Sequence, residues 1–413
     1  MLKKERYHGE VWFSENEAKR CFCILTFKDG EVSLETNLVS DKVHYKHQTI
    51  LGAFTGLGYL TFLDCHIKST SSGLTSNATY LPQYCFIHPH HLVEPRSLVF
   101  KKFSISNDEL TIWRQPNLDI DLSNKILNFD TEELHSFRIE NIKLAIELVF
   151  SVDSTFGRGQ FSSKTRGSVK FTSDTTVKVI GAIDVYRTFQ KLIQFISGQT
   201  CQFNYFNFQC LDCESWGSLY FQDDVYKGST FTYFTIDFND LLPDLPRLFD
   251  SIFNNESFSF CVTKLLDNQT TGKLSHSKRF TNSISCLEAY GKRFGQQKKP
   301  TLKQFLKDND ELIIKMTDVT NENLDDFVSN IIRSRDYHVH SNIENQNIFS
   351  DFELLYISLV LDIIVAIRLL QEIDVSQIII DKIIKKGRSV YREIQAVNRI
   401  LGYDYLRQSQ LEN

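Results

Sequence analysis

Proline and methionine are scarce in this chain, with 7 Pro and 2 Met among 413 residues, against 33 Phe and 16 Tyr. The aromatic excess predicts a strand-rich region. The chain also lacks an uninterrupted apolar run of membrane-spanning length. Residues 354–370 come closest, but they include Asp362 and Arg368, which predicts a buried core helix. The first residues carry positive charge with no apolar segment behind it, so neither a secretion signal nor a membrane partner is expected.

An excess of basic charge and a cysteine framework are also lacking. The net charge is -5 and the isoelectric point is near 6.1, which excludes a globally basic nucleic-acid coat and leaves only local binding of RNA or DNA. Nine cysteines are an odd number without framework spacing, so reduced thiols in the cytoplasm are expected. Ordinary globular usage, with 42% hydrophobic residues, and the length together predict two or three folded domains.

Signals for β-strands dominate residues 1–180, where alternating β-branched and aromatic runs are separated by Gly, Asn, Asp and Ser. Residues 21–27, the turn at 28–30 and residues 31–35 form a hairpin signature, because Gly30 accepts positive φ. Further strands are predicted at residues 59–63, 110–113, 142–151 and 168–171. This spacing predicts an antiparallel sandwich or barrel-like N-terminal domain.

The rest of the chain changes from mixed to helical signals. Residues 181–270 are predicted to be a mixed α/β continuation, with a helix that Gly198 closes, strands over 201–238, and a helix after Pro243 and Pro246. Residues 271–413 are predicted to form an all-α bundle, so the fold class is α+β multidomain. The predicted helices of the bundle are residues 278–295, 301–309, 321–337, 352–373, 375–386 and 388–401.

One segment, residues 324–341, places an arginine where a helix would bury an apolar side chain. Apolar residues at 324, 327, 328, 331 and 332 keep helical spacing, and the same stripe next reaches Arg335. A guanidinium at that place needs a carboxylate, a phosphate or a subunit interface. His340 lies about 140° away around an unbroken helix. We therefore expect either a helix break between Tyr337 and Ser341 or a site that a second copy of the chain completes.

The same segment contains a short motif in which Arg335 is followed at once by the polar Asp336 and then by His340. Arg333 and His338 form an overlapping pair in the alternative register. An arginine, a following polar residue and a histidine four to six positions after the arginine resemble the hallmark of HEPN domains, the helical ribonucleases of many bacterial toxins and antiphage systems. Asp336 departs from the asparagine that is commoner there, and its charge reduces the net positive charge facing a phosphate.

A second motif precedes the first. Glu288, Lys292 and Arg293 match the companion Glu-x3-Lys-Arg of HEPN domains, although Glu288 and Lys292 also have the spacing of a surface ion pair. Residues 9–13, Gly-Glu-Val-Trp-Phe, followed by a β-rich region and the HEPN pattern, resemble the ApeA-type proteins of abortive-infection defence. This resemblance implies that the β-rich region senses infection through a phage-derived trigger or restrains the nuclease.

The resemblance implies cytoplasmic, metal-independent cleavage of RNA, with tRNA among the candidate substrates and no cofactor. Histidine can act as base or acid near neutral pH, and arginine presents a planar fork to phosphate oxygens. The predicted catalytic residues are Arg335, His340 and Asp336, and the predicted supporting or RNA-binding residues are Glu288, Lys292, Arg293, Tyr337 and His338. Two protomers are expected to pair their 324–342 helices in a homodimer or higher homo-oligomer, so that two Arg-His sets line one cleft.

Four alternatives remain open. The helical bundle could be a non-catalytic module that only dimerises, while the β-rich region binds a partner. Residues 85–91 contain three histidines, for which a surface loop is expected and a metal-dependent hydrolase is the distant option. Cys210 and Cys213 form a lone Cys-x2-Cys without the second pair of a zinc site. The basic run over residues 382–392 is either a solvated helix face or an RNA contact.

Overall fold

A computed structural model gives the structure of the protein. It describes residues 5–28, 31–39, 48–71, 76–92, 97–106, 108–114, 118–121, 126–129, 132–157, 160–197, 205–211, 213–221, 236–270, 274–295, 301–340 and 349–401. The chain divides into two compact units, one formed by Met1–Tyr186 with Gln202–Val225 and the other by Arg187–Cys201 with Tyr226–Asn413. The three-part division predicted at residues 180 and 270 stays a prediction.

Antiparallel strands build the first unit, as the alternating sequence predicts. The strands are β1 (Glu5–Phe13), β2 (Cys21–Lys28), β3 (Glu31–Thr36), β4 (Gln48–Phe54), β5 (Gly58–Ser71), β6 (Asn77–Leu81), β7 (Tyr84–His88), β8 (Val99–Ser106), β9 (Leu118–Asp121), β10 (Ile126–Phe129), β11 (Glu132–Ile139), β12 (Leu144–Gly157), β13 (Gln160–Lys178), β14 (Tyr205–Cys210) and β15 (Trp216–Phe221). In β3, Val32, Leu34 and Thr36 point inward and alternate with more exposed neighbours, which is the period of a half-buried strand.

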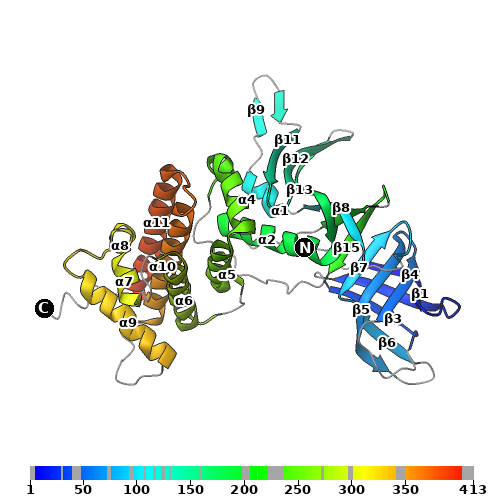
Figure 1. Ribbon diagram of the computed structural model, residues 1–413, viewed down its shortest axis with the longest axis horizontal. Coiled ribbons are helices and arrows are strands. Elements are labelled where there is room, and N and C mark those ends of the chain that lie inside the picture. The colour runs from blue at the N-terminus through cyan, green and yellow to red at the C-terminus, as the bar shows by residue number, and fades with distance from the viewer. Residues whose placement is uncertain are drawn as a thin grey trace. The chain divides into compact units, whose positions relative to one another are not determined.

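Strands β1 to β6 close into a barrel (Figure 1). Strand β5 makes the closure, because its first half pairs with β4 and its second half pairs with β6. Gly9 of the N-terminal signature faces Phe54 across the β1–β4 pair. A Cβ atom there would lie 2.2 Å from the carbonyl oxygen of Ala53, so only glycine permits this approach. The predicted barrel-like architecture is confirmed.

The first half of β5 also pairs with β7, and from there the sheet continues in the order β7, β15, β14, β8, β13, β12, β11. Strands β9 and β10 form a separate two-stranded sheet. The strand predicted at residues 110–113 is wrong, because that segment is helix α1 (Asp108–Arg114). Its Leu110 and Trp113 are buried three positions apart, a spacing that places both on one face of a helix. The turn predicted at Asp29-Gly30 lies outside the described residues.

Helices make up the described part of the second unit. Beyond α1, the helices of the chain are α2 (Val179–Ser197), α3 (Phe238–Leu241), the 3-10 helix η1 (Leu242–Asp244), α4 (Leu245–Asn254), α5 (Glu256–Thr270), α6 (His276–Phe294), α7 (Leu302–Lys307), α8 (Asp310–Met316), α9 (Leu324–His340), α10 (Asp351–Gln371) and α11 (Gln377–Leu401). Helix α2 begins in the first unit and ends in the second. The fold class, a β-rich region followed by a helical bundle, is as predicted.

Helix α10 is the core of the bundle and runs beside α6 (Figure 1). Ser350 begins it with a capping box, in which Ser350 and Glu353 each satisfy the other's backbone N–H. The two charged residues of its apolar stretch, residues 354–370, have buried partners: Asp362 accepts a hydrogen bond of 3.0 Å from Asn268, and Arg368 donates one of 2.7 Å to Asn309. The predicted buried core helix is confirmed. No helix within the described residues is long and apolar enough to span a membrane.

Two elements of the bundle differ from prediction. The two helices predicted at residues 375–386 and 388–401 are one continuous helix, α11. Gly387 does not end it, because this glycine lies at a close contact where a Cβ atom would be 3.0 Å from Sδ of Met316 and 3.1 Å from Cδ1 of Ile363. Helix α8, at residues 310–316, was not predicted.

Candidate functional site

Helix α9 presents one buried face to the bundle. Phe327, Val328, Ile331 and Ser334 are each at most 4% exposed. Arg335 lies at the edge of this face, with its side chain 26% exposed. The predicted position of Arg335 within the buried stripe is therefore corrected by one residue, because the small Ser334 takes the core position. The edge position lets the arginine keep its stem packed and its guanidinium accessible.

The side chains of Arg335 and His340 meet on this helix. Nη1 of Arg335 lies 3.0 Å from Nε2 of His340 and 2.8 Å from Oδ1 of Asp336. The helix continues unbroken to His340, its last residue, so of the two alternatives the structure does not show a break between Arg335 and His340. The angle of about 140° does not keep the two side chains apart, since the long arginine side chain reaches the imidazole. A guanidinium only donates hydrogen bonds, so Nε2 of His340 is the acceptor in this contact.

Glu288 of α6 completes this cluster. Nη2 of Arg335 lies 3.3 Å from Oε1 of Glu288, although the two residues are 47 positions apart. Of the partners expected for Arg335, a carboxylate, a phosphate or a subunit interface, the structure shows carboxylates, from Glu288 and from Asp336. The described residues show no Glu288–Lys292 ion pair, so the surface-pair interpretation is not supported.

Helix α6 holds Glu288 in place through its cap and its packing. Ser275 caps the helix by accepting a hydrogen bond of 3.2 Å from the backbone N–H of Lys278. Gly291, one turn after Glu288, lets the ring of Phe305 from α7 lie directly on the α6 backbone. A Cβ atom at Gly291 would be 1.8 Å from Cε1 of that ring. Helix α7 therefore fixes the end of α6 that carries the glutamate.

Lys292 and Arg293 lie in the last turn of α6, but only Lys292 is on the same face of the helix as Glu288. Lys292 is exposed and stands one turn beyond Glu288 on the same side of the helix. Arg293 turns to α5, where its Nη1 lies 3.3 Å from Oγ of Ser257. The guanidinium carbon of Arg293 is 4.0 Å from the ring centroid of Phe260. The structure thus separates the two basic residues that the motif places side by side.

Tyr337 and His338, the remaining predicted residues, differ in orientation. His338 packs edge-on against Phe280 of α6, with ring centroids 6.4 Å apart. Tyr337 is 38% exposed beside it. His338 is thus packed into the α6–α9 contact, whereas His340 is exposed at the helix end. This difference supports the register of Arg335 with His340 over Arg333 with His338.

Two carboxylates and one guanidinium share the cluster. The side chains of Glu288, Arg335 and Asp336 are 24%, 26% and 31% exposed, so water screens both ion pairs. Pairs of this kind contribute about 1 kcal/mol or less each. A phosphate group, which can bind a guanidinium through two parallel hydrogen bonds, can therefore replace a carboxylate at small cost. The cluster is suited to bind an anionic ligand in exchange for its own acids.

The histidine and cysteine patterns do not form a metal site in the part of the chain that the structure describes, where no group of three metal-ligating side chains is found. The loop expected over residues 85–91 is partly wrong, because Tyr84–His88 is strand β7 and His88 is buried. Cys85, Phe86 and His88 of this strand are buried in the packing of the sheet. The three histidines in the segment hid its strand pattern in the sequence. Cys210 is buried and Cys213 partly exposed, and both are free thiols.

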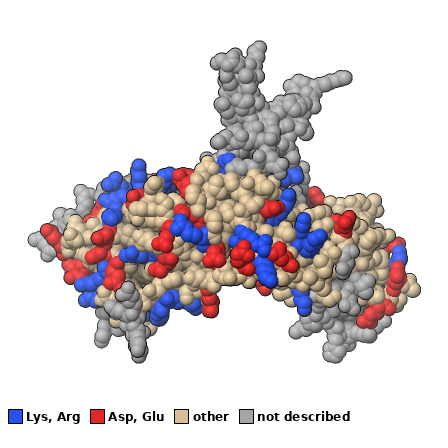
Figure 2. Space-filling view, turned by 45° about the horizontal axis from the view of Figure 1, so that its top comes forward, with Lys and Arg blue, Asp and Glu red and all other residues tan. Residues whose placement is uncertain are grey.

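The basic run of α11 is partly neutralised. Lys382 pairs with Asp240, and Arg388 pairs with Asp318. The visible face of the molecule in Figure 2 shows basic and acidic side chains interspersed. The run therefore gives little support to a strong RNA contact.

An α-helical bundle in which an Arg-x4-His segment meets a glutamate of an earlier helix has the features of the HEPN class. Residues 249–378 match the Apea-like HEPN domain, and residues 6–255, more than half of the chain, match ApeA N-terminal domain 1. The chain therefore belongs to the ApeA-like family. Among the curated proteins and the solved structures, none matches. The family supports a nuclease domain of antiphage defence.

The sequence did not predict helix α5 or its residues next to Arg293. Its first residues, Glu-Ser-Phe-Ser-Phe, alternate polar and apolar types and so hide the helical period. Asn255, immediately before them, is the signal that indicates a helix start, because its Oδ1 accepts a hydrogen bond of 3.1 Å from the backbone N–H of Phe258. Ser257 and Phe260 are distant in sequence from the Glu-x3-Lys-Arg motif, and only the fold brings them into contact with Arg293.

Proposed function

We propose that this protein is a metal-independent endoribonuclease of antiphage abortive-infection defence that cleaves RNA, with tRNA among its candidate substrates, in the cytoplasm. The observation that carries the proposal is the contact between Arg335 and His340 at the exposed end of α9, with Glu288 holding the same guanidinium. A cationic group that binds phosphate and an imidazole that can transfer a proton are two of the elements that metal-free cleavage of RNA requires.

In the proposed reaction, the 2'-hydroxyl oxygen of the RNA attacks the adjacent phosphorus. A base removes the hydroxyl proton, the bond from the 2'-oxygen to phosphorus forms, and the bond from phosphorus to the 5'-oxygen breaks as an acid protonates that oxygen. Arg335 exchanges a carboxylate for a phosphoryl oxygen and stabilises the charge that develops there. His340 is suited to be the base once Nη1 of Arg335 turns from Nε2 to the phosphoryl oxygen, because the Nε2 lone pair can then accept the hydroxyl proton. The products are a 2',3'-cyclic phosphate and a 5'-hydroxyl.

A second copy of the chain is part of the proposal, because one imidazole cannot be base and acid in the same step. His338 is turned to Phe280, which leaves His340 as the exposed histidine of α9. The last turn of α9 also exposes Tyr337 and Val339, at 38% and 48%. Apolar side chains beside a half-complete site favour an interface between two α9 helices. We propose that two such sets line one cleft in a homodimer or higher homo-oligomer.

The β-rich unit is proposed to sense a phage-derived trigger or to restrain the nuclease. The family match to ApeA N-terminal domain 1 over residues 6–255 supports a role distinct from the helical bundle. The two carboxylates on Arg335 support a restrained state, because they occupy the donors that a phosphate would use.

The test compares purified full-length wild type with Arg335→Ala and His340→Ala, each incubated with total RNA and with tRNA, with and without EDTA. Arg333→Ala and His338→Ala are the matched controls from the other register. We expect loss of cleavage in the first two variants, retention of most activity in the controls, cyclic phosphate ends, and no effect of EDTA. Undiminished cleavage by His340→Ala refutes the assignment, and EDTA sensitivity indicates a metal-dependent hydrolase instead. No cleavage by any form, even with phage lysate added as activator, favours the non-catalytic dimerising module.

The dimer is tested separately by co-expressing wild-type and His340→Ala chains at graded ratios. If both histidines of a pair are needed, activity falls with the square of the wild-type fraction. A linear fall means that each chain cleaves by itself and contradicts the shared cleft.

A further inference from the structure

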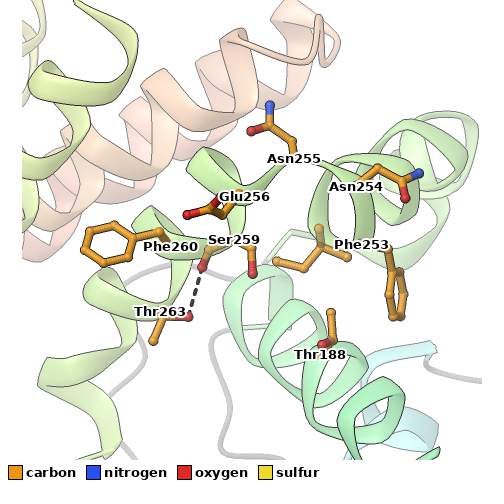
Figure 3. Close-up of a pocket in the computed structure, with 9 residues that line it drawn as sticks. Thr188, Phe253, Asn254, Asn255, Glu256, Ser259, Phe260 and Thr263 are labelled. Atoms are coloured by element: carbon orange, nitrogen blue, oxygen red, sulfur yellow. Dashed lines mark hydrogen bonds between the residues drawn. The ribbon is translucent and has the colours of Figure 1, made fainter. Parts of the chain in front are cut away.

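A cavity of about 450 Å³ lies within the second unit, where the end of α4 meets the start of α5 (Figure 3). Its lining includes Phe253, Asn254, Asn255, Ser259, Thr263 and Thr188, the last from the facing helix α2. Thr263 donates its hydroxyl hydrogen bond, 2.9 Å long, to the carbonyl of Ser259. Among the described residues, the amide nitrogen of Asn255 and the hydroxyl of Ser259 have no hydrogen-bond partner, so both can bind a ligand.

Phe260 forms another part of the wall and links the cavity to the motif on α6. Its ring is 38% exposed, and the guanidinium of Arg293 covers it at 4.0 Å. Arg293 is also within 3.9 Å of Glu256 at the mouth of the cavity. The second basic residue of the Glu-x3-Lys-Arg motif therefore lies at this cavity and not at the Arg335–His340 cluster.

The end of α6 provides a path from the cluster to the cavity. Lys292 rises about 6 Å beyond Glu288 on the same face of α6, and Arg293 is rotated from it by about 100° towards α5. Arg335 is held by Glu288, and from the face of Glu288 the α6 helix carries Lys292 and then Arg293 towards α5. An RNA backbone that leaves the cleaved phosphate can follow this order, with each phosphate near a cation.

The chemistry of the cavity fits an unpaired nucleobase. Bases of single-stranded RNA stack on aromatic rings and on arginine guanidinium planes, and they hydrogen-bond through their edges to amides and hydroxyls. Phe260 with Arg293 supplies the stacking surface, and Asn255 with Ser259 supplies the polar groups. Glu256 at the mouth disfavours a phosphate inside the cavity, so the base and not the backbone is the part that enters.

We propose that the cavity between α4 and α5 binds one unpaired base of the RNA substrate within a few nucleotides of the cleaved phosphate, and that Arg293 belongs to this subsite. The inference rests on the proposed ribonuclease function, and it assigns to that function a substrate with a single-stranded nucleotide beside the cut. The same base chemistry is present in a free nucleotide, which the test separates from RNA.

The test measures binding, so that it does not depend on cleavage. Full-length His340→Ala protein is titrated with a fluorescent single-stranded RNA, alone and combined with Phe260→Ala or with Ser259→Trp, which fills the cavity. Phe22→Ala, an equally sized change at a 58% exposed phenylalanine of the barrel, is the control. RNA containing 4-thiouridine is crosslinked to the same proteins, and mass spectrometry locates the crosslinked peptides. Uridine and adenosine monophosphates are added as competitors.

We expect Phe260→Ala to weaken RNA binding about tenfold, the effect of losing one base–aromatic stack, with Phe22→Ala unchanged. Ser259→Trp should weaken binding similarly and abolish crosslinks to residues 253–263. Helix content measured by circular dichroism shows whether each variant is folded, and Phe260→Ala remains decisive if Ser259→Trp is not. The inference is overturned if both variants bind RNA and crosslink to it as the unmodified cavity does. It is also overturned if the cavity binds free nucleotide while RNA binding is unaffected by the variants. RNA cleavage by wild type with no cavity effect refutes the subsite alone, whereas cavity binding without any cleavage, even with phage lysate added, refutes the proposed ribonuclease.

Discussion

Substituting Gly291 by alanine should destabilise the helical unit, although alanine is the better helix former. In a helix interior the exchange of glycine for alanine gains about 1 kcal/mol. At Gly291 the new Cβ would lie 1.8 Å from Cε1 and 1.9 Å from Cζ of Phe305. Carbon atoms pack at about 3.5–4.0 Å, so the ring must move by roughly 2 Å. Phe305 is 5% exposed and has no open space to enter, and overpacking of this kind costs about 1–3 kcal/mol or more. We expect a net loss of about 2 kcal/mol.

The distribution of tryptophan makes this loss measurable in one unit. The three tryptophans, Trp12, Trp113 and Trp216, all belong to the first unit. Tryptophan fluorescence therefore follows the first unit, while circular dichroism at helical wavelengths follows mainly the second. For a domain of roughly 200 residues, 1 kcal/mol corresponds to about 2–4 °C in midpoint. Gly291→Ala should lower the dichroism midpoint by about 4–8 °C and leave the fluorescence midpoint in place.

Two further variants control the reasoning. Gly181→Ala places a Cβ 3.4 Å from Cγ1 of Val177, an ordinary contact, and should lower neither midpoint. Phe305→Leu removes the ring atoms nearest to Gly291, so it should cost less in the Gly291→Ala background than in wild type. An unchanged or raised dichroism midpoint for Gly291→Ala would refute the close packing of α6 on α7.

Two predictions concern titratable groups. Burial lowers the pKa of His88 and of His91, so the unfolded chain takes up protons at pH values where these folded side chains stay neutral. The stabilisation is then fully present above the ordinary histidine pKa of about 6.5 and is lost as the pH decreases. The thermal midpoint measured by tryptophan fluorescence should therefore be lower at about pH 5 than at about pH 7. A midpoint that does not change with pH contradicts this prediction. Burial raises the pKa of Cys261 to about 11 and the pKa of Cys286 well above its usual range. Iodoacetamide at about pH 8 should therefore label the partly exposed Cys213 long before either, as peptide mass spectrometry will show, and equal labelling rates contradict the burial.

The pattern of apolar and polar residues within a single strand or helix predicted the elements whose structure depends on that pattern alone. The alternation in β2 and β3 follows from one buried face of each strand, and the capped apolar run at residues 351–371 follows from burial on nearly all sides. Packing between distant segments decided the rest. Gly387 reads as a helix end in the sequence, yet it continues α11 because Met316 and Ile363 lie against it. Such a contact has no signal within the helix itself.

The site shows the same division. The sequence required an anionic partner for Arg335, because a guanidinium at the edge of a core cannot remain unpaired. It could not name Glu288 as that partner by physics alone, since the pair depends on how α6 and α9 cross, and only the resemblance placed the two motifs in one domain. The angle of about 140° between Arg335 and His340 holds for the backbone of the helix, but it does not include the reach of the side chains. Side-chain length decided that the two groups meet.

In helix α6, neighbouring residues serve the candidate site and the packing of the bundle, so a variant there can change both activity and stability. Glu288 holds Arg335, Gly291 receives Phe305, and Lys292 and Arg293 lead away from the cluster. We therefore expect a change at Gly291 to lower the proposed activity indirectly, by moving Glu288. A loss of cleavage at this helix identifies a functional side chain only when the dichroism midpoint is unchanged. Glu288→Gln comes near that condition, because the screened ion pair that it removes contributes about 1 kcal/mol or less, so the midpoint falls by about 2–4 °C at most.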